Sequence, residues 1–154
     1  MRRLRSRAKP KNKGKKHERE FEQVLEAAYK KRVFIHRNKD TGDASGRAGK
    51  LTIVAAQPSD YIVTLDGITA YVEVKDCNNK TSFPFSNIRE SQWSAAKQQV
   101  AAKGLYFFVV HHKGTWFCIP AKVILDTTTR KSLPWKDLTD CELKKLTDIK
   151  RYFK

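Results

Sequence analysis

The chain has 154 residues, of which 32 are Lys or Arg and 16 are Asp or Glu, so its net charge is +16. This length suffices for one domain with its own core, and the charge favours an anionic partner, above all nucleic acid. No apolar run approaches the roughly 20 residues of a membrane-spanning helix, and no apolar stretch follows the basic N-terminus, so we expect neither a membrane anchor nor a signal peptide.

Cysteine and histidine usage points to a reducing compartment and away from structural zinc. The three cysteines, Cys77, Cys118 and Cys141, are odd in number and far apart, which predicts free thiols and a cytoplasmic location. We expect no structural zinc site, because the four histidines complete no recognised zinc-ligand spacing. These histidines are His17, His36, His111 and His112.

The first 16 residues carry many basic side chains and no acid. The basic residues are Arg2, Arg3, Arg5, Arg7, Lys9, Lys11, Lys13, Lys15 and Lys16. Because like charges repel, we predict a flexible arm over 1–16, attached to a single folded domain over 17–154. The arm is expected to lie on phosphates, each of which adds about 0.9 to the salt slope of binding to duplex DNA. The alternative is a solubilising tail or a targeting signal.

A first helix is predicted over 17–31 from an apolar repeat at i, i+3, i+4 and i+7. The repeat consists of Phe21, Val24, Leu25 and Ala28. Glu18 lies near one edge of this stripe, where it could point toward a site beside a sheet. The alternative, favoured by periodicity alone, is that Glu18 stabilises the N-terminal end of the helix.

A short strand over 33–36 and a polar loop over 38–50 are predicted next. The loop is rich in Gly, Lys and Arg but lacks the G-x-x-x-x-G-K-[ST] pattern, so a nucleotide-binding P-loop is not expected. Residues 51–54 are predicted to add a further strand.

Two β-rich runs, 58–65 and 68–75, flank Asp66-Gly67, which is a strong hairpin signal. A two-residue loop sets Leu65 opposite Ile68 and therefore Asp60 opposite Glu73. Lys75 shares a face with Glu73 because strand side chains alternate. The other face is entirely apolar and is expected to be the core. It carries Tyr61, Val63, Leu65, Ile68, Ala70, Val72 and Val74.

The opposed acids of this hairpin indicate a metal site. Their Cβ atoms would lie roughly 5 Å apart, where two like charges destabilise a sheet. A divalent cation such as Mg²⁺ reverses that penalty, because it binds carboxylates together with substrate phosphate. The alternative is an exposed hairpin face with an incidental pair between Lys75 and Glu73.

A second helix is predicted over 92–103, capped by Ser91, or by Ser86 or Asn87, and ended at Gly104. Its buried stripe is Trp93, Ala96 and Val100. The apolar run 105–110 predicts a central strand buried on both faces.

The remaining elements are a strand over 115–119, stopped by Pro120, and an amphipathic helix over 139–149. Three aromatic residues, Trp116, Phe117 and Trp135, favour core or dimer contacts over stacking on bases. No internal repeat and no second domain is evident.

Several motifs resemble those of junction-resolving nucleases. Pro58-Ser59-Asp60 followed by Glu73-Val74-Lys75 resembles the PD-(D/E)xK signature, and residues 12–18 resemble the N-terminal Gly-x-x-x-Glu element of cellular Holliday junction resolvases. Residues 73–84, with Asn-Lys-Thr-Ser-Phe-Pro at their end, resemble a segment of the bacterial RecU resolvases. Arg89-Glu90-Ser91-Gln92 resembles a helix start of the archaeal Hjc resolvases. The similarity covers about 14–110, most of the chain.

This resemblance implies an α/β fold with a restriction-endonuclease-like core, in which helices flank a mixed central β-sheet. It implies that Asp60 and Glu73 hold Mg²⁺, for which Mn²⁺ would substitute, and that Glu18 completes the acidic cluster. Lys75 would orient or activate the attacking water, and Gln92 would position Lys75 or the water. From the residues alone, Gln92 could equally be an exposed first-turn residue.

The resulting hypothesis is a homodimeric, Mg²⁺-dependent endonuclease that resolves four-way DNA junctions with paired symmetric nicks. The basic arm and Lys80 would bind the DNA. The protein would act in the cytoplasm, either associated with the nucleoid or encoded by a phage. Two alternatives stay open: a nuclease for other branched DNA, and a basic DNA-binding protein with a vestigial site. The intact acids and Lys75 argue against the second, because drift would first remove an unfavourable acid pair.

Overall fold

The computed structural model describes residues 13–38, 56–127 and 129–154. Its centre is a six-stranded sheet in the order β1-β2-β3-β5-β6-β8. The strands are β1 (Val33–Arg37), β2 (Tyr61–Leu65), β3 (Ile68–Asp76), β5 (Leu105–His112), β6 (Thr115–Pro120) and β8 (Glu142–Leu143). The arm residues 1–12, most of the 38–50 loop and the predicted strand 51–54 lie outside the described residues.

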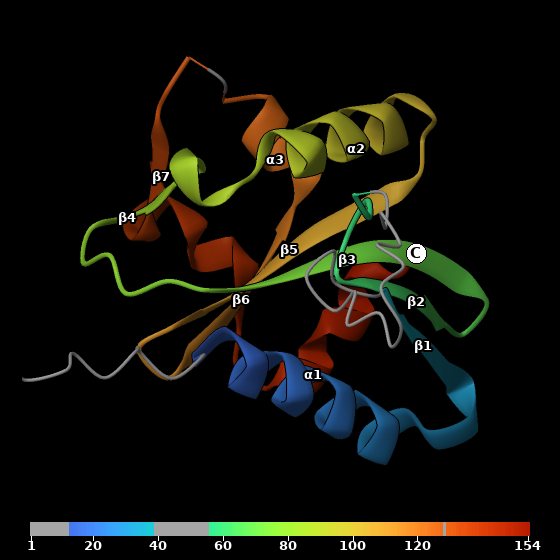
Figure 1. The fold of residues 1–154 in the computed structure, drawn as a ribbon. Coiled ribbons are helices and arrows are strands. Elements are labelled where there is room, and N and C mark those ends of the chain that lie inside the picture. Colours follow the sequence, from blue (N-terminus) through green and yellow to red (C-terminus); the bar gives the residue numbers. More distant parts are fainter. Residues whose placement is uncertain (1–12, 39–55, 128) are drawn as a thin grey trace, which may run out of the picture.

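Helices cover both faces of the sheet (Figure 1). One face carries α1 (Lys13–Tyr29) and a C-terminal 3₁₀ helix, η4 (Leu146–Tyr152). The other carries α2 (Glu90–Ala101) and α3 (Ala121–Leu125), together with the small sheet of β4 (Ser82–Pro84) and β7 (Ser132–Pro134). Further 3₁₀ turns are η1 (Lys30–Arg32), η2 (Phe85–Asn87) and η3 (Trp135–Cys141). Among the described helices, none has the length and apolarity needed to cross a membrane.

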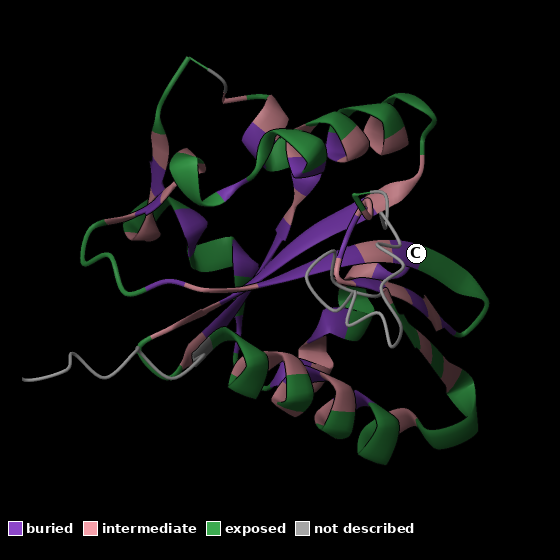
Figure 2. Ribbon diagram, viewed as in Figure 1, coloured by how far each residue is buried: buried purple, intermediate pink, exposed green. Residues whose placement is uncertain are grey.

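The strands of the sheet are mixed in direction. β3 runs parallel to β5, whereas the other neighbouring strands are antiparallel. β5 lies inside the sheet and is buried along most of its length, as its continuous apolar sequence predicts (Figure 2). The predicted strands over 33–36 and 115–119 are confirmed as β1 and β6.

The predicted hairpin and its register are confirmed. Leu65 pairs with Ile68 and Tyr61 pairs with Val72, so a two-residue loop connects β2 to β3. Asp66 and Gly67 have φ values of 51° and 85°, the left-handed conformations that a tight hairpin turn requires.

We expect Gly67→Ala to lower the free energy of unfolding by about 1 kcal/mol, because an L side chain is strained in the left-handed region. Gly14→Ala is the matched control: Gly14 lies in α1, and an added Cβ there meets no atom within 4 Å. Gly14→Ala should not lower the free energy of unfolding, and it could raise it by up to about 1 kcal/mol because alanine has the higher helix propensity. Urea unfolding of both variants measures the difference, and equal midpoints would contradict the role of the turn.

The apolar face of the hairpin is part of the core as predicted, with one exception. Tyr61, Val63, Leu65, Ala70, Val72 and Val74 are buried with Phe21 and Leu25 of α1. Ile68 is instead 37% exposed. The reason is that β3 pairs with β5 only from Ala70 onward, so Ile68 lies beyond the end of β5.

The predicted C-terminal helix over 139–149 is wrong. This segment contains the end of η3, the strand β8 and the start of η4. Its apolar residues are nevertheless buried, among them Cys141, Leu143, Leu146 and Ile149. The spacing of buried side chains imitates a helix, but pairing of Leu143 with Trp116 of β6 imposes a strand in its middle.

Helix boundaries also differ from prediction. α1 begins at Lys13, so residues 13–16 are helical rather than part of the predicted arm. α2 begins at Glu90 with Arg89 as its N-cap, so none of Ser86, Asn87 and Ser91 caps it. The Gln92 side chain instead accepts a hydrogen bond from the Arg89 backbone N–H at 2.9 Å. α2 ends at Ala101, just before Gly104 as predicted.

Candidate active site

Asp60 directly precedes β2 and is held there by the end of β1. The backbone N–H of Asn38 donates to the Asp60 carbonyl at 2.8 Å, and the Asn38 side-chain amide donates to the Ser59 carbonyl, also at 2.8 Å. Buried Ser59 donates its hydroxyl to the carbonyl of Tyr61 at 2.7 Å. These hydrogen bonds fix the backbone just before β2 and thereby position the carboxylate of Asp60.

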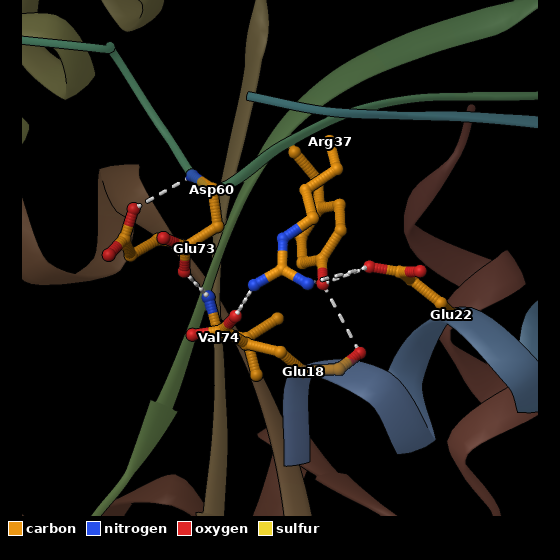
Figure 3. A network of polar contacts seen from close by, with 7 residues as sticks. Glu18, Glu22, Arg37, Asp60, Glu73 and Val74 are labelled. Carbon is orange, nitrogen blue, oxygen red and sulfur yellow. Dashed lines mark hydrogen bonds and ion pairs between the residues drawn. The ribbon is translucent and has the colours of Figure 1, made fainter. Parts of the chain in front are cut away.

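Asp60 and Glu73 meet across the hairpin. The Asp60 backbone N–H donates to Oε2 of Glu73 at 3.1 Å, and Oδ2 of Asp60 accepts from the backbone N–H of Val74 at 2.9 Å (Figure 3). Each acid therefore uses one carboxylate oxygen to bind the backbone of the opposite strand. This arrangement agrees with the pairing that the two-residue loop predicts.

The carboxylate of Glu73 lies in an unfavourable environment for a negative charge. Glu73 is only 3% exposed. Burial, together with the nearby Asp60 carboxylate, raises the pKa of Glu73 to about 7. The ammonium group of Lys75, 3.0 Å from Oε1 of Glu73, acts in the opposite direction and lowers that pKa. Such a site gains from a bound cation, because a cation offsets both the burial and the repulsion between the acids.

Gln92 connects the acid to the lysine. The Nζ ammonium of Lys75 donates a hydrogen bond to Oε1 of Gln92 at 2.9 Å. The Nε2 amide of Gln92 in turn donates to Oε1 of Glu73. Gln92 is only 6% exposed, so the alternative of an exposed first-turn residue is wrong. Docking of α2 on the sheet turns this position inward. Asp60, Glu73, Lys75 and Gln92 thus form one set of contacts.

Glu18 belongs to an adjoining network. Its carboxylate pairs with the guanidinium of Arg37, and its carbonyl accepts from the Tyr61 hydroxyl at 3.2 Å (Figure 3). The same hydroxyl donates to Oε1 of Glu22 at 2.5 Å. Because α1 begins at Lys13, Glu18 lies beyond the first turn, where a charge interacts less with the helix dipole. The side chain of Glu18 extends from α1 toward β3 at Val74.

Sequence reasoning missed Arg37, Asn38 and Tyr106, which support the site. Tyr106 of β5 donates its hydroxyl to the carbonyl of Pro58 at 2.6 Å, which holds the segment leading to Asp60. Burial and the nearby acids raise the pKa of Tyr106, so the phenol stays neutral. No spacing in the sequence relates these three residues to the acids. Arg37 and Asn38 do follow the predicted strand over 33–36 directly.

The predicted DNA-binding residues are described only in part. Lys15 and Lys16 are exposed at the start of α1, and Lys80 is exposed in the turn before β4. Arg2, Arg3, Arg5, Arg7, Lys9 and Lys11 lie outside the described residues, as does the side chain of Lys13.

We expect the affinity for Mg²⁺ to fall as the pH is lowered through about 7. Glu73 must lose its proton to bind a cation, so below its pKa of about 7 the affinity should drop up to tenfold per pH unit. The sign follows from linkage. The native state holds this proton more tightly than the unfolded state, so the stability of the metal-free protein falls as the pH rises from 4.5 to 7. Mg²⁺ should restore more of this stability at pH 8 than at pH 6, because Glu73 is ionised at pH 8.

Titration calorimetry and thermal unfolding with Mg²⁺ at pH 6 and pH 8 measure this dependence. Glu73→Gln is the control, because an amide in place of the carboxylate removes the titration. Equal Mg²⁺ affinity in the native protein at the two pH values would contradict the prediction.

Two comparisons with known proteins found a match, one to a sequence family and one to a solved fold. A sequence model of the family described as RecU, Recombination protein U, matches residues 17–151. Among solved structures, the fold is similar to that of Hjc, a Holliday junction resolvase from the archaeal hyperthermophile Archaeoglobus fulgidus, with a TM-score of 0.52. Sequence identity is 14%, and the match covers 79% of this chain and 86% of that chain. A comparison with curated proteins found no similar sequence.

These findings confirm the predicted α/β architecture, a restriction-endonuclease-like core with a mixed central sheet between helices. The match to Hjc, at such low identity, concerns the fold alone. The family match is broader evidence, since it reaches from α1 through η4 and includes Asp60, Glu73, Lys75 and Gln92. This protein belongs to the RecU (Recombination protein U) family.

Proposed function

We propose that this protein is a structure-selective DNA endonuclease that resolves four-way (Holliday) junctions by metal-dependent phosphodiester hydrolysis, with paired symmetric nicks. The observation that carries the proposal is the contact set of Asp60, Glu73, Lys75 and Gln92 in a chain of the RecU family. The fold shared with Hjc, itself a Holliday junction resolvase, supports it.

The donor set fits a hard divalent cation. Asp60 and Glu73 offer carboxylate oxygens, the ligands that Mg²⁺ and Mn²⁺ prefer, and burial together with the Asp60 carboxylate raises the pKa of Glu73, a penalty that a bound cation would offset. Asp60 and Glu73 would hold Mg²⁺, and Glu18 would complete the acidic cluster directly or through water. When bound, Mg²⁺ supplies positive charge at the scissile phosphate and makes the attacking water more acidic.

The other residues of the site act on the water and the phosphate. Lys75 would orient the attacking water and stabilise the negative charge that develops on the phosphate. Gln92 is a positioning residue, because its amide holds both the ammonium of Lys75 and the carboxylate of Glu73. Arg37 would fix the orientation of Glu18 through their ion pair.

We further propose that the protein works as a homodimer. A four-way junction has near two-fold symmetry, so a two-fold dimer would place equivalent sites on two equivalent strands. Selectivity would come from the shape of the junction and the placement of its phosphates, with the basic residues of 1–16 and Lys80 on the DNA backbone. The three free, buried cysteines fit a reducing compartment, so we place this activity in the cytoplasm, on nucleoid or phage DNA.

The test is a cleavage assay on a synthetic four-way junction beside a linear duplex of the same sequence. With Mg²⁺ we expect paired cuts on opposing strands of the junction, none on the duplex, and none in EDTA or with Asp60→Asn. Equal cutting of duplex, or of flaps and nicked forks, would favour the alternative of a nuclease for other DNA. Tight binding without cuts under Mg²⁺ or Mn²⁺ would favour a non-catalytic DNA-binding protein and overturn the proposal.

A further inference from the structure

A second cluster of potential metal ligands lies on the opposite face of β3. His17 of α1, Asp76 at the end of β3 and His111 of β5 each offer one ligand atom, and these atoms lie within 4.8 Å of one another. Nε2 of His17 is 3.5 Å from Oδ1 of Asp76, and Nδ1 of His111 is 3.2 Å from the same oxygen. Asp76 and His111 are paired in the parallel ladder of β3 and β5, so the sheet itself sets their spacing.

The three side chains are held in place before any metal binds. Their exposed fractions are 13% for His17, 13% for Asp76 and 16% for His111. The two imidazoles stack with centroids 3.8 Å apart, and Trp116 packs edge-on against both rings. An aromatic wall and a rigid sheet therefore limit the motion of all three ligands.

An outer carboxylate orients the first histidine. Nδ1 of His17 lies 3.3 Å from Oε2 of Glu20, one helical turn further along α1. A hydrogen bond from Nδ1–H to this carboxylate leaves the lone pair of Nε2 facing Asp76. Metal-binding histidines almost always donate their second nitrogen in this way, which fixes the tautomer and makes the ligand more basic.

We propose that His17, Asp76 and His111 form a binding site for a transition-metal ion of the zinc class. A tetrahedral ion with bonds of about 2.0–2.2 Å spaces its ligand atoms by about 3.3 Å, close to the two distances that meet at Asp76. Imidazole ligands suit Zn²⁺, Co²⁺ and Ni²⁺, whereas Mg²⁺ prefers oxygen alone. With three protein ligands, the fourth position is left for water or a phosphate oxygen.

This site differs from the one at Asp60 and Glu73 and does not depend on the proposed nuclease activity. Side chains alternate along β3, so Asp76 points to the α1 face, whereas Glu73 and Lys75 point toward α2. A metal here joins the start of α1 to the ends of two central strands. It therefore fixes the helical turn that carries Glu18, the residue after His17, and the point where the basic N-terminal segment meets the domain.

The prediction from the sequence that there is no structural zinc site rested on local spacing. The three ligands lie on α1, β3 and β5, far apart in the chain, and only the parallel pairing and the docking of α1 bring them together. No local motif could have revealed them.

The experiment is Co²⁺ and Zn²⁺ binding to full-length protein freed of metal with EDTA. We expect one Co²⁺ per chain with a visible spectrum of tetrahedral or five-coordinate type, no thiolate charge-transfer band, and displacement by one equivalent of Zn²⁺. His17→Gln and His111→Gln should each lose stoichiometric binding. Glu20→Gln should weaken binding by about 10–100-fold, because it removes only the outer carboxylate.

Matched variants separate this site from others. His36→Gln, at an exposed position of β1, and His112→Gln, which removes the ring stacked on Trp135, should bind Co²⁺ as the native protein does. Glu73→Gln should also retain it, so a failure of the nuclease proposal leaves this result unaffected. Circular dichroism of the metal-free variants checks their folding.

Three outcomes would overturn the inference. They are the absence of stoichiometric binding, binding that survives in both His17→Gln and His111→Gln, and binding that is lost in Glu73→Gln. The first would mean that the two histidines only contact Asp76 and do not ligate a metal with it.

Discussion

Glu73→Gln is expected to lower the rate of junction cleavage by at least about 10²–10³-fold while the affinity for the junction stays nearly unchanged. The amide keeps the size of the side chain but cannot ligate Mg²⁺ as a carboxylate does. Glu73 has little solvent around it, being 3% exposed, so water cannot readily supply the missing ligand. Single-turnover cleavage under Mg²⁺ and a gel-shift assay in EDTA measure the two quantities.

Glu142→Gln is the matched control for this variant. Glu142 is an exposed glutamate on the edge strand β8, so the same change of charge there should leave the cleavage rate within about twofold. If Glu73→Gln cut junctions within about tenfold of the native rate, Glu73 would not be a metal ligand and the assigned site would be wrong.

Lys75→Met is expected to lower the cleavage rate by about 10²–10³-fold, the range seen when one group that stabilises developing negative charge is removed. Methionine keeps most of the length of the side chain but removes the ammonium that contacts Glu73 and Gln92. Unlike Glu73→Gln, this variant should retain Mg²⁺ binding, because both carboxylates remain. The pair of variants thus distinguishes a group that holds the metal from one that acts on water and phosphate.

Calorimetry with Mg²⁺ and single-turnover cleavage test this contrast. Lys122→Met is the control, since Lys122 is an exposed lysine paired with Asp126 on α3 and away from the site. A Lys75→Met protein that cleaves at the native rate would remove Lys75 from the chemistry. Loss of Mg²⁺ binding in this variant would instead give Lys75 a structural role in holding Glu73.

Local signals predicted the central part of the site. The Asp66-Gly67 turn sets the hairpin register, and a register once set determines which side chains share a face. Asp60, Glu73 and Lys75 could therefore be related to one another without knowledge of any other element. The continuous apolar run of β5 was equally informative, because a strand buried on both faces needs no alternation.

Contacts between distant elements were harder to infer. The inward position of Gln92 depends on how α2 docks, and the pair between Glu18 and Arg37 depends on α1 lying beside β1. Only the resemblance to resolvases suggested roles for Gln92 and Glu18. The C-terminal segment was mispredicted for a related reason: 3₁₀ turns and a two-residue strand bury side chains at nearly helical intervals, and only pairing with β6 distinguishes them.

The amino-acid sequence alone therefore determined the basic character of the protein, the hairpin with its opposed acids and the buried central strand. These features rest on interactions between neighbouring residues and on charge, which the order of residues specifies directly. The tertiary structure decided the burial that raises the pKa of Glu73, the contacts of Gln92, and the meeting of His17, Asp76 and His111. Each of these depends on packing between elements far apart in the chain, and periodicity does not encode such packing.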